Sequence, residues 1–145
     1  MRRLKTISKA RFVSASYPLL QEISTRVSDV DTYGHLNAIR LGQYYEDARA
    51  AFYRSVLGQA PNRRTLVAEL KMRYLREGEW PGDIQVGTGV LTIGATSLVM
   101  AQALFQNGGC IGLADTVLVR ADASRSIPLE TDIRERLQNL MLRGG

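Results

Sequence analysis

The chain has 145 residues, 45% of them hydrophobic, and a formal net charge of +5. This length fits one domain with a sizeable core, and no apolar run approaches the ~20 residues of a membrane span, so we expect none. The single cysteine, Cys110, excludes an intrachain disulfide and favours a reducing, cytoplasmic compartment. One cysteine and one histidine do not predict a metal site.

The positive charge is concentrated at the amino terminus, which we interpret as a basic arm, residues 1–18, before one domain, residues 19–145. Five basic residues precede the first acidic one: Arg2, Arg3, Lys5, Lys9 and Arg11. Short basic segments of this kind are commonly either frayed or docked on the protein surface. Of these two states, we expect the frayed one. The alternative is a contact with ligand phosphates, anionic lipid or nucleic acid.

The first half of the domain predicts a strand, a polar loop and a long helix. Residues 19–27 alternate, imperfectly, between apolar and polar positions, which indicates a half-buried strand. Polar residues fill most of 28–37. From 38 to 57 apolar residues recur at steps of three and four, which predicts an amphipathic helix roughly 30 Å long. Gly58 and Pro61 then provide the expected end.

Four more strands and a terminal helix are predicted beyond this helix. Strand patterns cover 65–76, 84–93, 98–106 and 110–120, and the terminal helix covers 129–142. Asn107-Gly108-Gly109 predicts a tight hairpin turn. Antiparallel sheets can be apolar on one face only, which suits the alternation. The order therefore predicts an α+β fold, a five-stranded antiparallel sheet curled around the long central helix, with a C-terminal helix.

The loop before the long helix carries the strongest chemical signal. Asn37 is a good N-cap, because its side-chain oxygen can accept a free backbone N–H of the first turn. The start of a helix offers further N–H donors and partial positive charge, which can hold a developing oxyanion. Asp31 lies six residues upstream. A carboxylate beside such donors is the minimum set for hydrolysing an activated acyl group.

These residues resemble a known family. DVDTYGHLN at 29–37, followed by EDAR at 46–49, is similar to the D-x-D-x-x-G-H-x-N…E-x-A-R signature of the 4-hydroxybenzoyl-CoA thioesterase-like branch of the hotdog-fold superfamily. MRYLR at 72–76 and PGD at 81–83 extend the resemblance, which covers roughly residues 19–128. Ala38 departs from it, since many members have a second asparagine there. The resemblance implies a hotdog fold and an acyl-CoA thioesterase that needs no cofactor, because CoA is part of the substrate.

The resemblance also implies roles within the loop. Asp31 would act as general base on water or attack the thioester carbon itself; an Asx turn that shapes the loop is the alternative. Tyr33 would donate to the thioester or line the pocket, unless it only packs over the helix start. Gly34 would let the backbone approach substrate, unless it only forms a turn. His35 would order the loop or donate its backbone N–H, since no G-x-S-x-G motif supplies a triad serine. Asn37 would cap the helix and orient substrate.

The sequence also predicts roles for several other charged residues. Candidate partners for the CoA phosphates are four arginines near predicted strand ends: Arg73, Arg76, Arg120 and Arg125. The basic arm is a further candidate for this contact. Glu46 and Arg49 lie three residues apart on the long helix, where we expect them to pair at the surface.

A curled sheet leaves a free edge and an exposed face, so we expect dimerisation. The resemblance implies a homodimer or homotetramer, with acyl-CoA bound across the subunit boundary. The competing function is a non-catalytic acyl-CoA or acyl-carrier binding module, which Ala38 favours. Nucleic-acid binding through the arm is a third reading. It lacks an aromatic stacking platform, and we do not expect it.

Overall fold

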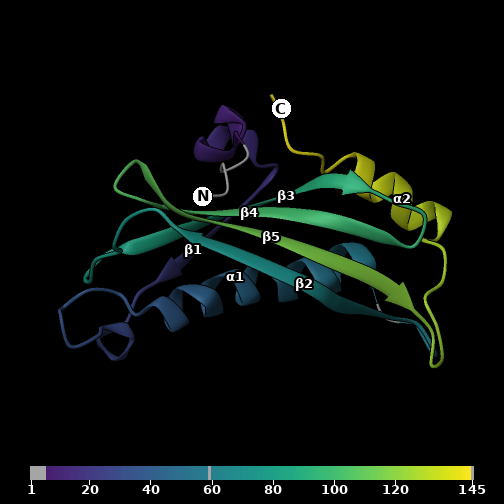
Figure 1. The fold of residues 1–145 in the computed structure, drawn as a ribbon, viewed down its shortest axis with the longest axis horizontal. Coiled ribbons are helices and arrows are strands. Elements are labelled where there is room, and N and C mark those ends of the chain that lie inside the picture. The colour runs from purple at the N-terminus through teal and green to yellow at the C-terminus, as the bar shows by residue number, and fades with distance from the viewer. Residues whose placement is uncertain (1–5, 59, 145) are drawn as a thin grey trace, which may run out of the picture.

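The structure, a computed structural model, describes residues 6–58 and 60–144 and confirms the predicted α+β fold. The strands are β1 (Leu19–Ser24), β2 (Arg64–Tyr74), β3 (Asp83–Ile93), β4 (Ser97–Gln106) and β5 (Gly109–Ala121), and the helices are α1 (Ala38–Phe52) and α2 (Thr131–Gln138). The strands form one antiparallel sheet in the order β1-β3-β4-β5-β2, with α1 along one face (Figure 1). Within the described residues, no helix is both long and apolar enough to span a membrane.

The predicted element boundaries hold to within a few residues, with three differences. The strand β1 ends at Ser24 rather than at residue 27, because residues 27–29 form a 3₁₀ turn. The α-helix α1 ends at Phe52, and a π-helical turn continues it to Leu57. The helix α2 is shorter than the predicted 129–142, because the segment after it runs beside β3. There Leu140 O accepts from Val90 N at 2.8 Å, and Leu142 N donates to Val90 O at 2.8 Å.

The core lies between the sheet and α1. Alternate residues of β4 face the helix and are fully or almost fully buried: Leu98, Met100, Gln102 and Leu104. Tyr45 and Phe52 pack onto this face from α1. The helix therefore forms the spine that its apolar periodicity predicted, and it carries the loop at residues 28–37 to one end of the sheet (Figure 1).

The amino-terminal segment is docked on the other face of the sheet, which we call the outer face. Arg11 is 6% exposed and makes an ion pair of 2.7 Å with Asp115. Its guanidinium also donates to Tyr17 Oη at 3.1 Å. Tyr17 fits closely over Gly87, where a Cβ atom would lie 2.6 Å from its ring. The expectation of fraying is thus wrong for residues 6–18, because Arg11 pairs with Asp115 of the sheet and bonds to the buried Tyr17; Arg2, Arg3 and Lys5 lie outside the described residues.

The predicted surface pair of Glu46 and Arg49 is also wrong. Arg49 is 6% exposed and donates to Gln102 Oε1 at 3.3 Å, while Glu46 is exposed. Gln102 in turn donates to Thr88 Oγ1 and to Tyr45 O, each at 3.1 Å. A buried amide in the middle strand thus draws the arginine inward, because each buried polar group needs a partner.

Candidate active site

The loop before α1 is anchored to the helix by a buried carboxylate. Asp29 is 7% exposed, and its Oδ2 accepts from Tyr44 Oη at 2.6 Å and from Arg26 N at 3.1 Å. Its carbonyl oxygen accepts from Asn37 N at 2.7 Å. Burial raises the pKa of Tyr44, and the Asp29 carboxylate raises it further, so the phenol stays a donor. Both ends of the loop therefore meet at Asp29, whose role the sequence analysis missed.

Asp31 shapes the turn at the tip of the loop. Its Oδ1 accepts from the backbone N–H groups of Tyr33 at 2.9 Å and His35 at 3.1 Å. Its own N–H donates to His35 O at 2.7 Å. This is the Asx geometry considered from the sequence. Among the residues that the structure describes, none donates to Oδ2, so one oxygen holds the turn while the other stays available.

The remaining loop residues have distinct environments. Gly34 has a φ of +83°, a conformation that favours glycine. Its N–H donates to Asp31 O at 3.2 Å. His35 Nε2 lies 3.0 Å from Glu77 Oε2, which joins the loop to the segment after β2. Tyr33 is 85% exposed. Asn37 caps α1 as predicted, with Oδ1 accepting from Ile39 N at 2.8 Å.

A cleft of about 340 Å³ joins the loop, the start of α1 and the end of β2. Its lining residues are Asp31, His35, Leu36, Ala38, Leu41, Tyr74, Leu75, Arg76 and Glu77. A larger cavity of about 410 Å³ lies over the outer face beside Phe12 and Phe105, but none of the predicted site residues lines it. We therefore take the smaller cleft, where Asp31 meets the helix start, as the candidate active site.

The four predicted phosphate partners do not gather at this cleft. Only Arg76 lines it, with a guanidinium that donates to Gln106 O at 3.1 Å. Arg73 is half-buried within β2, and Arg125 is exposed in the loop after β5.

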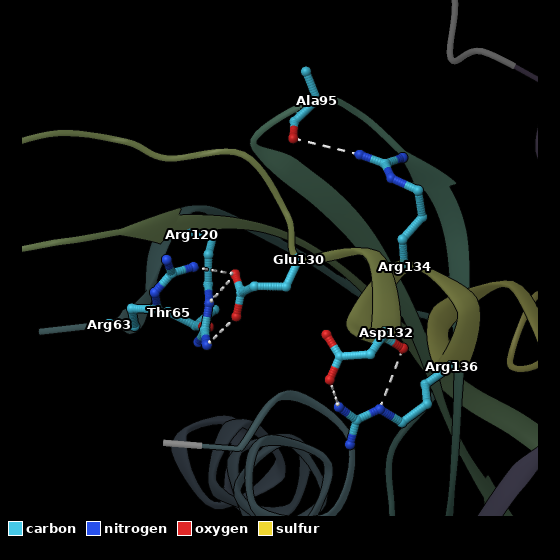
Figure 2. A network of polar contacts seen from close by, with 8 residues as sticks. All are labelled: Arg63, Thr65, Ala95, Arg120, Glu130, Asp132, Arg134 and Arg136. Carbon is cyan, nitrogen blue, oxygen red and sulfur yellow. Dashed lines mark hydrogen bonds and ion pairs between the residues drawn. The ribbon is translucent and has the colours of Figure 1, made fainter. Parts of the chain in front are cut away.

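Arg120 has a structural environment instead. It is 2% exposed and donates to both oxygens of Glu130, at 3.1 and 2.8 Å, and to Thr65 Oγ1 at 3.2 Å (Figure 2). The hydrogen bonds from Arg120 lower the pKa of Glu130. Arg63 approaches Glu130 Oε1 at 3.3 Å as well. A guanidinium so occupied is not free for a ligand phosphate, so the sequence assignment of Arg120 does not suit this structure.

Metal-ligating side chains do not cluster at the cleft. In residues 6–58 and 60–144, no group of three or more His, Cys, Asp or Glu residues could hold a metal ion.

The chain belongs to the thioesterase-like superfamily, whose sequence model matches residues 25–137. A curated relative is the uncharacterized protein YsmA of Bacillus subtilis, 24% identical over 87 residues, which are 59% of this chain and 59% of that protein. The match thus spans about three fifths of YsmA.

Solved structures share the fold. The PA5185 protein of Pseudomonas aeruginosa is 24% identical, with a TM-score of 0.82 over 92% of this chain and 98% of its own. A predicted thioesterase of Bacillus stearothermophilus is 25% identical, with a TM-score of 0.77 over 87% and 98%. A Thermus thermophilus thioesterase, complexed with coenzyme A and Zn, is 27% identical, with a TM-score of 0.76 over 84% and 98%. The hotdog fold predicted from the sequence is therefore confirmed.

Proposed function

We propose that the protein is an acyl-CoA thioesterase of the 4-hydroxybenzoyl-CoA thioesterase-like branch, with Asp31 as its catalytic carboxylate. The observation that carries this proposal is the position of Asp31, held by two backbone N–H groups through Oδ1 and lining the cleft at the start of α1. The family membership supports a thioesterase. The coenzyme A in the Thermus thermophilus thioesterase supports a CoA-type ligand.

In the proposed reaction, the start of α1 polarises the thioester carbonyl and stabilises the oxyanion that develops on it. The N–H of Ile39 is taken by Asn37, and that of Leu41 donates to Asn37 O at 3.0 Å. The N–H groups of Ala38 and Arg40 have no acceptor among the described residues. Ala38 lines the cleft, so its N–H can polarise the thioester carbonyl with the aid of the helix dipole.

Asp31 acts either as the general base or as the nucleophile of the reaction. As general base, Oδ2 takes a proton from water while the water oxygen attacks the thioester carbon; the C–S bond then breaks, and the thiolate of CoA takes up a proton. As nucleophile, Oδ2 attacks the carbon itself, the C–S bond breaks, and the thiolate of CoA leaves and takes up a proton. Water then hydrolyses the resulting anhydride to the free acid and restores the Asp31 carboxylate. The N–H of His35 serves the turn of Asp31 rather than the substrate. In this scheme His35 and Glu77 hold one wall of the cleft, and Tyr33 is free to meet substrate or a second subunit.

Assembly and location belong to the same proposal. The strand β2 is the last in the sheet order, and its other side is unpaired within the described chain. We propose a homodimer through this edge, and a cytoplasmic location on the ground of the single free cysteine.

A panel of acyl-CoA substrates tests the activity. Wild-type protein is mixed with aliphatic acyl-CoAs of several chain lengths and with aromatic acyl-CoAs, and a thiol-reactive dye follows the release of CoA. We expect steady-state turnover for at least one class. Saturable binding of acyl-CoA without thiol release would instead establish the acyl-CoA binding module that Ala38 favours.

A further inference from the structure

The hairpin turn between β4 and β5 consists of a chemically labile pair, Asn107 and Gly108. Both residues are exposed and lie beyond the last paired residues of the two strands, Gln106 and Gly109. Their φ values are +51° and +75°. A Cβ atom built on Gly108 would meet no other atom within 4 Å. Asn107 and Gly108 can therefore move relative to each other without breaking a bond of the strand ladder.

No hydrogen bond restrains the two groups that can react with each other. Within residues 6–58 and 60–144, neither the side-chain amide of Asn107 nor the N–H of Gly108 has a hydrogen-bond partner. Asparagine is among the thermolabile residues, and its amide is attacked most readily by the N–H of a following glycine, which no side chain shields. The other asparagines, Asn37, Asn62 and Asn139, are followed by alanine, arginine and leucine.

Arg76 lies against this turn and also lines the candidate active site. Its guanidinium donates to Gln106 O at 3.1 Å. A Cβ atom built on Gly109 would lie 2.6 Å from Arg76 Cζ, so the guanidinium rests on the backbone of this glycine. Arg76 and Asn107 line one cavity of about 200 Å³. Among the described residues that line the candidate active site, Arg76 is the one arginine or lysine, and it forms no ion pair with a described residue.

We propose that Asn107 is a site of spontaneous deamidation, and that the carboxylate formed there pairs with the guanidinium of Arg76 at the edge of the candidate active site. The modification needs no enzyme and no co-reactant except water. The inference goes beyond the proposed function, and only its consequence for a CoA ligand rests on that function.

The chemistry involves only the two residues of the turn. The N–H of Gly108 loses its proton to hydroxide, and the nitrogen attacks Asn107 Cγ. The new N–C bond closes a succinimide ring, and the side-chain nitrogen of Asn107 takes up a proton and leaves as ammonia. Water then opens the ring at one of its carbonyls, which gives aspartate or isoaspartate. Both products have a carboxylate in place of the neutral amide, and the rate rises with pH because the attacking nitrogen must be deprotonated.

The new carboxylate alters the charge around Arg76. Glu77 and Glu79 already line the cavity that Arg76 shares with Asn107, so deamidation adds a further negative charge beside one guanidinium. Because Arg76 is exposed, we expect an ion pair of modest strength, which changes a binding equilibrium by roughly 2- to 5-fold. An anionic ligand in the candidate active site then competes with a carboxylate of the protein for its arginine.

Peptide mass spectrometry of ageing protein tests the modification itself. Wild-type protein is kept for days in neutral and in mildly alkaline buffer, and samples are digested at intervals. We expect the mass of the deamidated form to accumulate in the peptide of Asn107 before it does so in those of Asn37, Asn62 and Asn139, and faster at the higher pH. Deamidation at Asn107 that is no faster than at the other three overturns the proposal.

The substitution N107D reproduces the aspartate product and tests its contact with Arg76. The NMR signal of the Arg76 Nε–H group, assigned by its loss in R76Q, should shift in N107D and during the ageing of wild type. The control N62D adds the same charge at another exposed asparagine of positive φ, before the opposite end of β2, and should leave this signal in place. An unchanged Arg76 signal in folded N107D overturns the pairing.

Titration calorimetry with coenzyme A measures the consequence for a ligand. We expect N107D to raise the Kd roughly 2- to 5-fold, N62D to leave it unchanged, and N107D to cause no further rise in an R76Q background. The same rise in both backgrounds would overturn the role of Arg76. A wild type that fails to bind coenzyme A would refute the proposed CoA ligand, while the mass and NMR measurements would still decide the modification and its contact with Arg76.

Discussion

The loop at Asp31 and the cluster at Glu130 are both organised around one carboxylate, but they leave it in opposite states. Glu130 has both oxygens bonded to the buried guanidinium of Arg120, and Arg63 adds a further contact (Figure 2). Asp31 uses one oxygen for backbone N–H groups and keeps the other for the cleft. A fully bonded carboxylate contributes to stability, whereas a half-bonded one is oriented and still able to react.

The substitution D31N should have the largest effect, and it bears on activity. The amide Oδ1 can still accept from Tyr33 and His35, so the turn should persist, but the ionised oxygen is lost. We expect kcat to fall by ~100-fold or more, with a melting temperature close to wild type. Steady-state kinetics and thermal melts measure the two effects, with D47N on the exposed side of α1 as control. Near wild-type turnover in folded D31N would remove Asp31 from the mechanism.

The substitution E130A should produce the reverse pattern. It leaves the guanidinium of Arg120 buried without its carboxylate, and breaking such a pair costs several kcal/mol. Because Glu130 is partly exposed, we expect a loss of about 2–4 kcal/mol in the free energy of unfolding. The kcat of the folded protein should be unchanged. Urea denaturation measures the loss, and wild-type stability in E130A would contradict the contrast between the two carboxylates.

The stability of the wild type should also depend on pH through Glu130. The bonds from Arg120 hold its pKa in the folded state below the ordinary value of 4.5. The ionised form therefore stabilises the folded state above about pH 4.5, and this contribution is lost as the pH falls through the lowered pKa. Urea denaturation at a series of acidic pH values should show a steeper loss in wild type than in E130Q. Parallel curves would show that Glu130 is not linked to folding.

The substitution Y44F should have the smallest effect and tests how the loop is held. It removes one hydrogen bond to Asp29, which keeps the bond from Arg26 N. We expect a loss of about 1 kcal/mol in stability. We also expect kcat to fall by roughly 3- to 5-fold with little change in KM, because a looser loop misplaces Asp31 without removing substrate contacts. If kcat stays at the wild-type value, the Asp29 contact only stabilises the fold.

The sequence predicted the fold well because apolar periodicity is a local signal. The strands and α1 follow from alternation and from steps of three and four residues, and Asn37 follows from its place before the helix. The wrong predictions concern the environments of charged residues whose partners are distant in sequence. Arg11 and Arg49 read as surface residues, yet Asp115 and Gln102 draw them into the protein from 104 and 53 residues away.

In the candidate active site, too, contacts between residues close in sequence could be predicted and contacts between distant ones could not. The Asx turn at Asp31 could be predicted from the sequence, because Asp31 forms it with Tyr33 and His35, two and four residues later. It did not reveal the anchoring of Asp29, whose partner Tyr44 lies 15 residues on. Of the candidate phosphate arginines, Arg76 lines the cleft and Arg120 is bound to Glu130. The sequence could not separate the two, because a basic side chain near a strand end has no local signal for a distant partner.

The docking of the amino-terminal segment has a consequence for synthesis of the chain. Arg11 donates to Ala114 O, 103 residues away, and pairs with Asp115. At about 5–20 residues per second, β5 follows Arg11 off the ribosome by roughly 5–20 seconds. During that interval Arg11 lacks the β5 groups to which it binds in the folded protein. A residue made well before β5 therefore reaches these native contacts only after β5 has been made.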